Sequence, residues 1–422
     1  MRITSFKHNC MNLFIVCALV LVSVTPMIGS RVPMIIIMAL DFLWVIDILI
    51  KKNRSLPGKA IIYLPLLIIG IVFAYKIIGI SSAEWGNYAV QLFFYTSIWM
   101  MHYISDEYSI SQKRSLSFFC YYLILANIIS NIYMYYTIGR YTSWSYVSAS
   151  KMEDFVRNYN LGSTSFVSTV TIFSGVAFSL FVCTKDKKKK ILFAIGSILS
   201  LFYLIVCSGR ATTLIQIVVM FVLFFLYRNE RTSNVVPLVI VFLAIVFYLF
   251  RIQILNVISD LLPNERMAVR IRAIGQFVSG VDVEGDYLSR IEIIALDFST
   301  WLRSFGSFFF GIGDHRYLAG HLSDIYTIGI SGHSDYFDFL AKYGIVGFTL
   351  LNILFISLLK YFRTITSVDK RFRRYISIVF LVFLMRSVIG SIFSTDIAAA
   401  MFIFASNSMF MMDERNFDSE QA

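Results

Sequence analysis

The residues best suited to chemistry lie in one long polar segment, between Arg251 and His333, that interrupts a series of apolar spans. Its arginines include Arg266, Arg270, Arg272, Arg290, Arg303 and Arg316. The segment then contains Gly311-Ile-Gly313 and ends in Gly332-His333-Ser334-Asp335-Tyr336. A guanidinium stays protonated in low dielectric and presents a planar fork to phosphate oxygens. An arginine-rich polar loop on an apolar base therefore indicates a site for an anionic, lipid-borne substrate.

The composition explains why such a segment is unusual in this chain. Of 422 residues, 58% are hydrophobic and only 15% are charged, whereas a soluble domain has about 25% charged residues. The mean hydropathy is +0.72. These values predict one all-α polytopic membrane protein instead of the several soluble domains that length alone would suggest. The net charge of +11 lies mostly in short loops, so it indicates membrane orientation, and no nucleic-acid partner is expected.

Apolar stretches long enough to cross a bilayer recur along the chain, since a spanning helix needs about 20 apolar residues. We expect about twelve such helices, at 10–30, 33–50, 60–80, 85–104, 116–137, 163–184, 191–208, 211–228, 234–254, 336–361, 375–395 and 396–412. The first follows Arg2 and Lys7 and has no A-x-A-like site after it, which favours a retained helix over a signal peptide.

Basic residues predict the orientation of these spans. They fall in five clusters that alternate with cation-poor loops: Lys51 to Lys59, Lys113 and Arg114, Lys185 to Lys190, Arg228 and Arg231, and Arg363 to Arg374. All five reach the cytoplasm if both chain termini are cytoplasmic. The expected organisation is nine helices with short loops over 1–254, a large outer loop over 255–335, and three helices with a cytoplasmic tail over 336–422.

Three residues in or beside the outer loop have alternative interpretations. Arg210 follows Cys207-Ser208-Gly209 between two spans, and it either snorkels to lipid headgroups or has a function. Arg290 opens an expected helix over 286–305, where it either pairs with Asp297 two turns later or contacts substrate. His333 can exchange a proton near neutral pH, or it can be a structural histidine.

Other features of the outer loop favour structure over chemistry. Residues 265–279 have the pattern of an amphipathic helix on the outer leaflet. Gly311 and Gly313 mark a turn or a close backbone approach. Further on, Gly344 and Gly347 share a helix face and permit close helix packing.

Neither a metal site nor a disulfide framework is expected. The five cysteines lie in or beside apolar segments without metal-ligand spacing, so they are interpreted as buried thiols. The histidines and aspartates of the outer loop match no zinc signature, and the neighbouring arginines would repel a cation. We therefore predict no cofactor.

Three patches, in order, resemble the O-antigen polymerase and O-antigen ligase superfamily. Ser208-Gly209-Arg210-Ala211 resembles its S-R-[G/A/T] element. Arg290 is followed by Phe310-Gly311-Ile312-Gly313. His333-Ser334-x-Tyr336 is followed by Leu340-x-x-Tyr343-Gly344-x-x-Gly347, which resembles its H-[N/S]-x-[aromatic/aliphatic] and G-[I/L]-x-G elements. The resemblance covers roughly residues 205–350. The chain departs from the usual pattern of the superfamily at two points: Ser334 replaces the commoner Asn, and no proline precedes the G-x-G. The resemblance therefore does not distinguish a polymerase from a ligase.

This resemblance implies a GT-C-like glycosyltransferase of the bacterial inner membrane that inverts the anomeric carbon without a metal. The donor would be a glycan on undecaprenyl diphosphate, and the acceptor a hydroxyl of another lipid-linked repeat unit. Arg210 and Arg290 would hold the diphosphate, while His333 would act as general base or orient the diphosphate. The expected substrate-binding residues are Gly311, Gly313, Ser334 and Tyr336. The outer-loop arginines other than Arg290 are interpreted as interface anchors.

The interpretation as a polymerase implies two further partners, membrane lipid and a chain-length regulator protein. The alternative in the same class is an O-antigen ligase that transfers glycan to lipid A-core. An alternative from another class is a polysaccharide flippase or transporter, which predicts charged residues along a central cavity. Only Lys76 and Arg386 are candidates for such positions, and Arg386 has Asp396 nearby as a possible structural partner.

Overall fold

In a computed structural model, every regular element among the described residues is a helix, as the sequence predicts. The structure describes residues 108–138, 164–207, 211–227, 236–261, 265–278, 286–311, 334, 336–346, 348–349, 352, 369–386, 404–405 and 407–412. The first four expected spans, between 10 and 104, lie outside this set, as do Cys10 and Cys17. Cys120, Cys183 and Cys207 are free thiols, two of them buried.

Three helices are long and apolar enough to cross a membrane, which agrees with a helical membrane protein. They cover Ile110–Thr137, Phe166–Cys183 and Lys187–Cys207, close to the expected spans 116–137, 163–184 and 191–208. The corresponding elements are α5 (Ile110–Ile138), α7 (Thr164–Cys183) and α8 (Lys187–Phe202), which continues into a π-helical turn, η3 (Tyr203–Cys207). A shorter apolar helix, α9 (Ala211–Leu226), matches the span expected at 211–228.

Two helix boundaries differ from those expected. Helix α10 (Val236–Leu261) continues past the predicted end at 254 after a kink at Phe250, where φ is −109° and ψ is 18°. Helix α15 (Lys370–Arg386) begins inside the basic cluster rather than at 375. The carboxylate of Asp369 explains this start, because its Oδ1 accepts the backbone N–H groups of Arg371 at 2.8 Å and Phe372 at 2.9 Å.

The expected span at 396–412 is not one continuous α-helix over its described part. Residues 404–405 are π-helical, and η7 (Ser408–Met411) is a 3₁₀ turn that starts after Asn407. The helix expected at 336–361 is present at 336–346 and in the described residues 348, 349 and 352.

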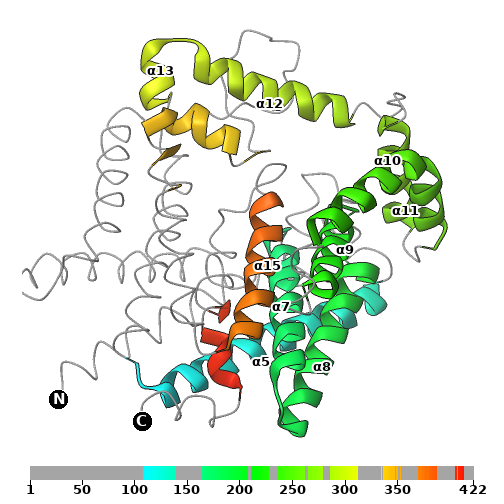
Figure 1. Cartoon of the computed structure of the whole chain (residues 1–422), viewed down its shortest axis with the longest axis vertical. Coiled ribbons are helices and arrows are strands. Elements are labelled where there is room, and N and C mark those ends of the chain that lie inside the picture. The colour runs from blue at the N-terminus through cyan, green and yellow to red at the C-terminus, as the bar shows by residue number, and fades with distance from the viewer. Residues whose placement is uncertain are drawn as a thin grey trace, which may run out of the picture.

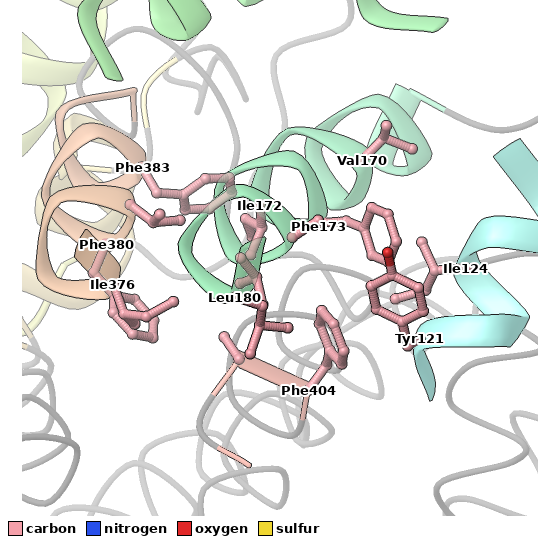
Figure 2. Packing of buried hydrophobic residues seen from close by; sticks show 14 of the residues in the cluster. Tyr121, Ile124, Val170, Ile172, Phe173, Leu180, Ile376, Phe380, Phe383 and Phe404 are labelled. Carbon is pink, nitrogen blue, oxygen red and sulfur yellow. The ribbon is translucent and has the colours of Figure 1, made fainter. Parts of the chain in front are cut away.

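Helix α7 is the most buried of the three long helices. It stands beside α15 in Figure 1 and lies between α5 and α15 in Figure 2. Its Phe173 ring lies 4.8 Å from the Tyr121 ring of α5 and stacks 5.7 Å from Phe404. Tyr121 also donates its hydroxyl proton to the carbonyl oxygen of Leu192 in α8, at 3.0 Å. Gly196 of α8 makes room for that hydroxyl, which would overlap any Cβ at this position. The core is therefore built by aromatic packing at close helix crossings.

The contacts of α7 set the directions of α9 and α15. Two levels of contact define the register: Gly175 with Met220 and Val379, and Phe178 with Phe224 and Tyr375. Moving from the first level to the second, residue numbers rise in α7 and α9 and fall in α15. Helices α7 and α9 are therefore parallel, and α15 is antiparallel to both.

Members of several basic clusters lie at one end of the bundle. Arg114 Nε donates to the Phe410 carbonyl at 3.0 Å, and Lys189 Nζ donates to the Met412 carbonyl at 3.1 Å. At the same end, Arg374 Nη1 donates to the carbonyl of Tyr227, just after α9, at 3.0 Å. We call this the basic end.

Helix α11 (Glu265–Val278) confirms the predicted amphipathic helix over 265–279. Its apolar face is covered by α10, because Ile271 is buried in a small cluster with Leu255. On the polar side, Arg272 is exposed and lies 3.3 Å from Asp260. The apolar face therefore packs on protein, whereas the sequence suggested that it lies on the lipid leaflet.

Helix α12 (Asp286–Leu302) confirms the helix expected over 286–305 but ends three residues earlier. A separate short helix, α13 (Phe305–Phe310), begins after the extended residue Ser304. Figure 1 shows α12 running crosswise above α7 and α15, from the side of α10 and α11 to α13. Arg290 is thus carried by a helix that crosses the end of the bundle.

Candidate functional site

The corner between α12 and α13 is held by specific contacts. Trp301 near the end of α12 donates its indole N–H to the Phe308 carbonyl at 2.9 Å, and the two rings stack at 5.0 Å. Ser304 and Ser307 form a reciprocal capping box, in which each hydroxyl accepts the other's backbone N–H, at 3.1 and 2.9 Å. These hydrogen bonds satisfy two backbone N–H groups at the start of α13. They stabilise a helix that is too short to be stable by its own internal hydrogen bonds.

Gly311 ends α13 in a backbone conformation that side chains exclude. Its φ is 70° and its ψ is −179°, a region that is essentially restricted to glycine. A Cβ here would also overlap the carbonyl group of Lys342 and the backbone nitrogen of Tyr343. The sequence predicted either a turn or a close backbone approach at this glycine, and the structure shows both.

Gly344 makes the reciprocal contact from the other segment. Its φ is 64°, and a Cβ would overlap the carbonyl group of Phe309 and the backbone nitrogen of Phe310. The close approach that the sequence predicted at Gly344 is confirmed, with the end of α13 as the neighbour and a positive φ that a regular helix would not have. Gly347 lies outside the described residues. We call the contact of residues 309–311 with 342–344 the glycine crossing.

Ser334 opens the segment that reaches the glycine crossing. Its carbonyl accepts the N–H of Asp338 at 2.8 Å, which starts the helical turns of residues 336–346. The side chain is fully buried, and its Oγ has no hydrogen-bond partner within the part of the chain that the structure describes. A buried hydroxyl without a partner is destabilising unless a ligand or water bonds to it.

Aromatic contacts join this segment to α12. The Phe337 ring lies 6.2 Å from the Phe298 ring of α12. Tyr336 is half-buried, and its ring lies 5.8 Å from that of Phe348. In Figure 1 the yellow-orange ribbon of residues 336–346 lies beside α13. Gly311, Ser334 and Tyr336, which the sequence proposed as substrate-binding, therefore belong to one packed unit with α12 and α13.

The remaining predicted site residues are less fully described. The backbone of Arg290 lies in α12, eight residues before Phe298, or about 12 Å along the helix axis. Its side chain lies outside the described residues, as do Arg210, Gly313 and His333. Whether the two arginines and the histidine meet at one site stays a prediction.

Three charged residues of α12 and of the segment 336–346 are buried, a burial that the sequence had not predicted. Lys342, which contacts Gly311 through its backbone, is 6% exposed, Asp338 is 8% exposed, and Asp297 of α12 is fully buried. The Lys342 ammonium lies 5.5 Å from the centroid of the Tyr343 ring. Charged side chains are seldom buried unless they are paired or functional. The four-residue spacing of Asp338 and Lys342 in an apolar stretch was the available signal.

Within the described residues, no group of three His, Cys, Asp or Glu side chains could hold a metal ion. Chemically, the unit offers a buried ammonium, two buried carboxylates, a buried hydroxyl and two crossing backbones, which together form a polar environment. Neither known protein-family models nor curated protein sequences match this chain, so the function is inferred from its own residues.

Proposed function

We propose that this chain is a membrane glycosyltransferase that polymerises a surface polysaccharide such as O-antigen from undecaprenyl-diphosphate-linked units. The glycine crossing is the observation that supports this proposal most. It joins residues 309–311 to residues 342–344, which belong to two of the three patches on which the resemblance to the O-antigen polymerase and ligase superfamily depends. A backbone contact between distant motif residues is expected when both motifs build one site.

The proposed topology has about twelve spans in a GT-C-like arrangement, a number that needs roughly 240 apolar residues. The basic end would face the cytoplasm, by the positive-inside rule. The start of α9 and the α12–α13 unit would then face the outside of a bacterial inner membrane. Such a site excludes nucleotide sugars, which are cytoplasmic, and suits donors already flipped on a lipid carrier.

The proposed reaction is a single displacement. The oxygen of the acceptor hydroxyl forms a bond to the anomeric carbon of the donor, and the bond from that carbon to the diphosphate oxygen breaks. His333 accepts the hydroxyl proton and passes it to water, while undecaprenyl diphosphate leaves with the electron pair. Attack from the opposite face inverts the anomeric configuration.

Arg210 and Arg290 would stabilise the charge that develops on the diphosphate. Hydrogen bonds to charged groups contribute roughly 1.5–3 kcal/mol each. Two arginines would therefore lower the barrier by several kcal/mol, on the order of 10² to 10⁴ in rate. Arginine and histidine chemistry of this kind needs no metal ion.

Reconstitution tests the proposal. The purified chain in lipid nanodiscs, with an undecaprenyl-diphosphate-linked repeat unit and EDTA, should form a polymer ladder. Arg210→Ala, Arg290→Ala and His333→Ala should each abolish or greatly shorten the ladder. Arg272→Ala is the matched control, because this arginine is exposed on α11, where it pairs with the exposed carboxylate of Asp260 and donates to the Ser259 hydroxyl.

Three outcomes contradict the polymerase. Full ladders from all three site variants would refute the residue assignment. Transfer to added lipid A-core without polymer would identify a ligase. Movement of the lipid-linked unit across the bilayer without a new glycosidic bond would identify a transporter.

A further inference from the structure

One face of α9 changes from apolar to polar along its length. Thr213, Gln216, Met220 and Phe224 recur at spacings of three and four residues, so they share a helix face, and all four are buried. Met220 and Phe224 pack on α7 at Gly175 and Phe178. Thr213 and Gln216 occupy the same face toward the start of α9, at the end of the bundle away from the basic end.

These two polar side chains lack the hydrogen bonds that burial requires. Gln216 is 8% exposed and Thr213 fully buried. The Thr213 hydroxyl and both polar atoms of the Gln216 amide find no hydrogen-bond partner within the described part of the chain. Native proteins pair such groups with protein, water or ligand, since leaving them unmet is destabilising. A leucine at position 216 would fill the same space without the cost of an unbonded amide. We therefore expect the Gln216 amide to have a hydrogen-bond partner that is absent from the described residues.

The neighbouring face of α7 is also polar at this level. Counting back from Gly175 by four and by seven residues gives Thr171 and Ser168, both buried. Thr171 donates its hydroxyl proton to the Val167 carbonyl at 2.8 Å, which leaves its lone pairs available. Across from them, α15 ends at Arg386, seven residues beyond Val379. At the level of the start of α9, the face of α7 that packs on α9 therefore carries small hydroxyl side chains.

The start of α9 also favours an anion. The first N–H groups of a helix have no partner within the helix, and they carry the positive end of its dipole. No acidic residue occupies this first turn to neutralise it. Helical side chains lean toward the N-terminus, so the Gln216 amide lies over the turn that contains Thr213.

We propose that Thr213 and Gln216 bind the glycosyl diphosphate junction of the substrate, an inference that rests on the proposed function. Thr213 and the Gln216 N–H groups donate to phosphate oxygens. The Gln216 carbonyl oxygen accepts from a hydroxyl or acetamido N–H on the adjoining sugar. Bare diphosphate supplies acceptors alone, so only a sugar-bearing diphosphate satisfies both halves of the amide. Gln216 thereby distinguishes the loaded carrier from the spent one.

Binding to the full-length protein in nanodiscs tests this assignment with two probes, the undecaprenyl-diphosphate-linked repeat unit and bare undecaprenyl diphosphate. Gln216→Leu should weaken binding of the loaded carrier by about 10- to 100-fold, as expected for lost bonds to a charged group. Its effect on the bare carrier should be smaller. Thr213→Val should weaken both probes by a similar factor. Gln216→Met, which conserves volume beside Met220, serves if the leucine variant is poorly produced.

Thr169→Val is the matched control. Thr169 is another buried hydroxyl without a partner in the described region, but it lies on a different face of α7, so binding should not change. The thermal midpoint of the unliganded Gln216→Leu protein should stay equal or rise, which separates a binding defect from misfolding. If wild type binds and polymerises while Gln216→Leu binds both probes equally well, the amide holds only water and the inference is wrong. If wild type binds neither probe, the proposed function itself fails.

Discussion

Replacing Gly311 with alanine should open the glycine crossing. The native φ of 70° with ψ of −179° is a conformation that non-glycine residues adopt at a cost of about 1–3 kcal/mol. The new Cβ would also overlap the backbone of Lys342 and Tyr343, which cannot rotate aside as a flexible side chain can. Overpacking of this kind typically costs about 1–3 kcal/mol more. The combined destabilisation is therefore about 2–6 kcal/mol.

Thermal unfolding of the purified variant in detergent measures this effect, and limited proteolysis between α12 and residue 346 localises it. Gly306→Ala is the matched control from the same six-residue helix. Its Cβ would meet only the Ser304 hydroxyl at 3.8 Å, an ordinary contact. Alanine is also the better helix former there, so the thermal midpoint should hold or rise.

A double variant sharpens the test. Gly344→Ala acts on the same crossing from the opposite side, so once the backbones separate, the second substitution meets less resistance. The combined cost of Gly311→Ala and Gly344→Ala should fall below the sum of the single costs by about 1 kcal/mol or more, as for coupled sites. If Gly311→Ala were as stable as Gly306→Ala, or if the two costs simply added, the crossing would not be the close contact described.

Three further outcomes follow from local contacts. Ser334→Ala should leave the thermal midpoint unchanged, because Oγ has no partner among described residues, yet should raise the KM for the lipid-linked unit. Ser307→Ala, by contrast, should lower the free energy of unfolding by about 0.5–2 kcal/mol through loss of the capping box, which thermal unfolding measures. Asp369→Ala should lower it by a similar amount, about 0.5–2 kcal/mol, by uncapping α15. Asp260→Ala, which removes an exposed pair with Arg272 and a 3.3 Å contact with the Ser259 hydroxyl, should change the midpoint little; equal effects of the two aspartates would contradict the capping role.

Helices were predictable where their signal is local. Long apolar runs anticipated α5, α7, α8 and α9, and alternating arginines and apolar residues anticipated α11. The helix boundaries were less predictable, because a boundary depends on single side chains. Asp369 starts α15 within a basic cluster, since two N–H groups bond to its carboxylate.

The site was predictable only in part, for a physical reason. Gly311 could be identified as a turn residue because few other residues permit its backbone. Gly344 could be identified as a site of close packing, but its contact with the end of α13 could not, because that contact depends on how two distant segments cross. The buried state of Lys342 and of Gln216 likewise comes from packing between elements, and no spacing rule reveals it.

The stoichiometry of carrier release tests the central claim most directly. The reconstituted chain, supplied with lipid-linked repeat units in EDTA, should release one undecaprenyl diphosphate for each new glycosidic bond, with inverted anomeric configuration. Arg290→Ala should reduce both quantities by about 10- to 100-fold, the loss expected for one charged hydrogen-bonding group, while Arg272→Ala leaves them unchanged. Carrier release without a new bond, polymer of retained configuration, or full activity in Arg290→Ala would contradict the account.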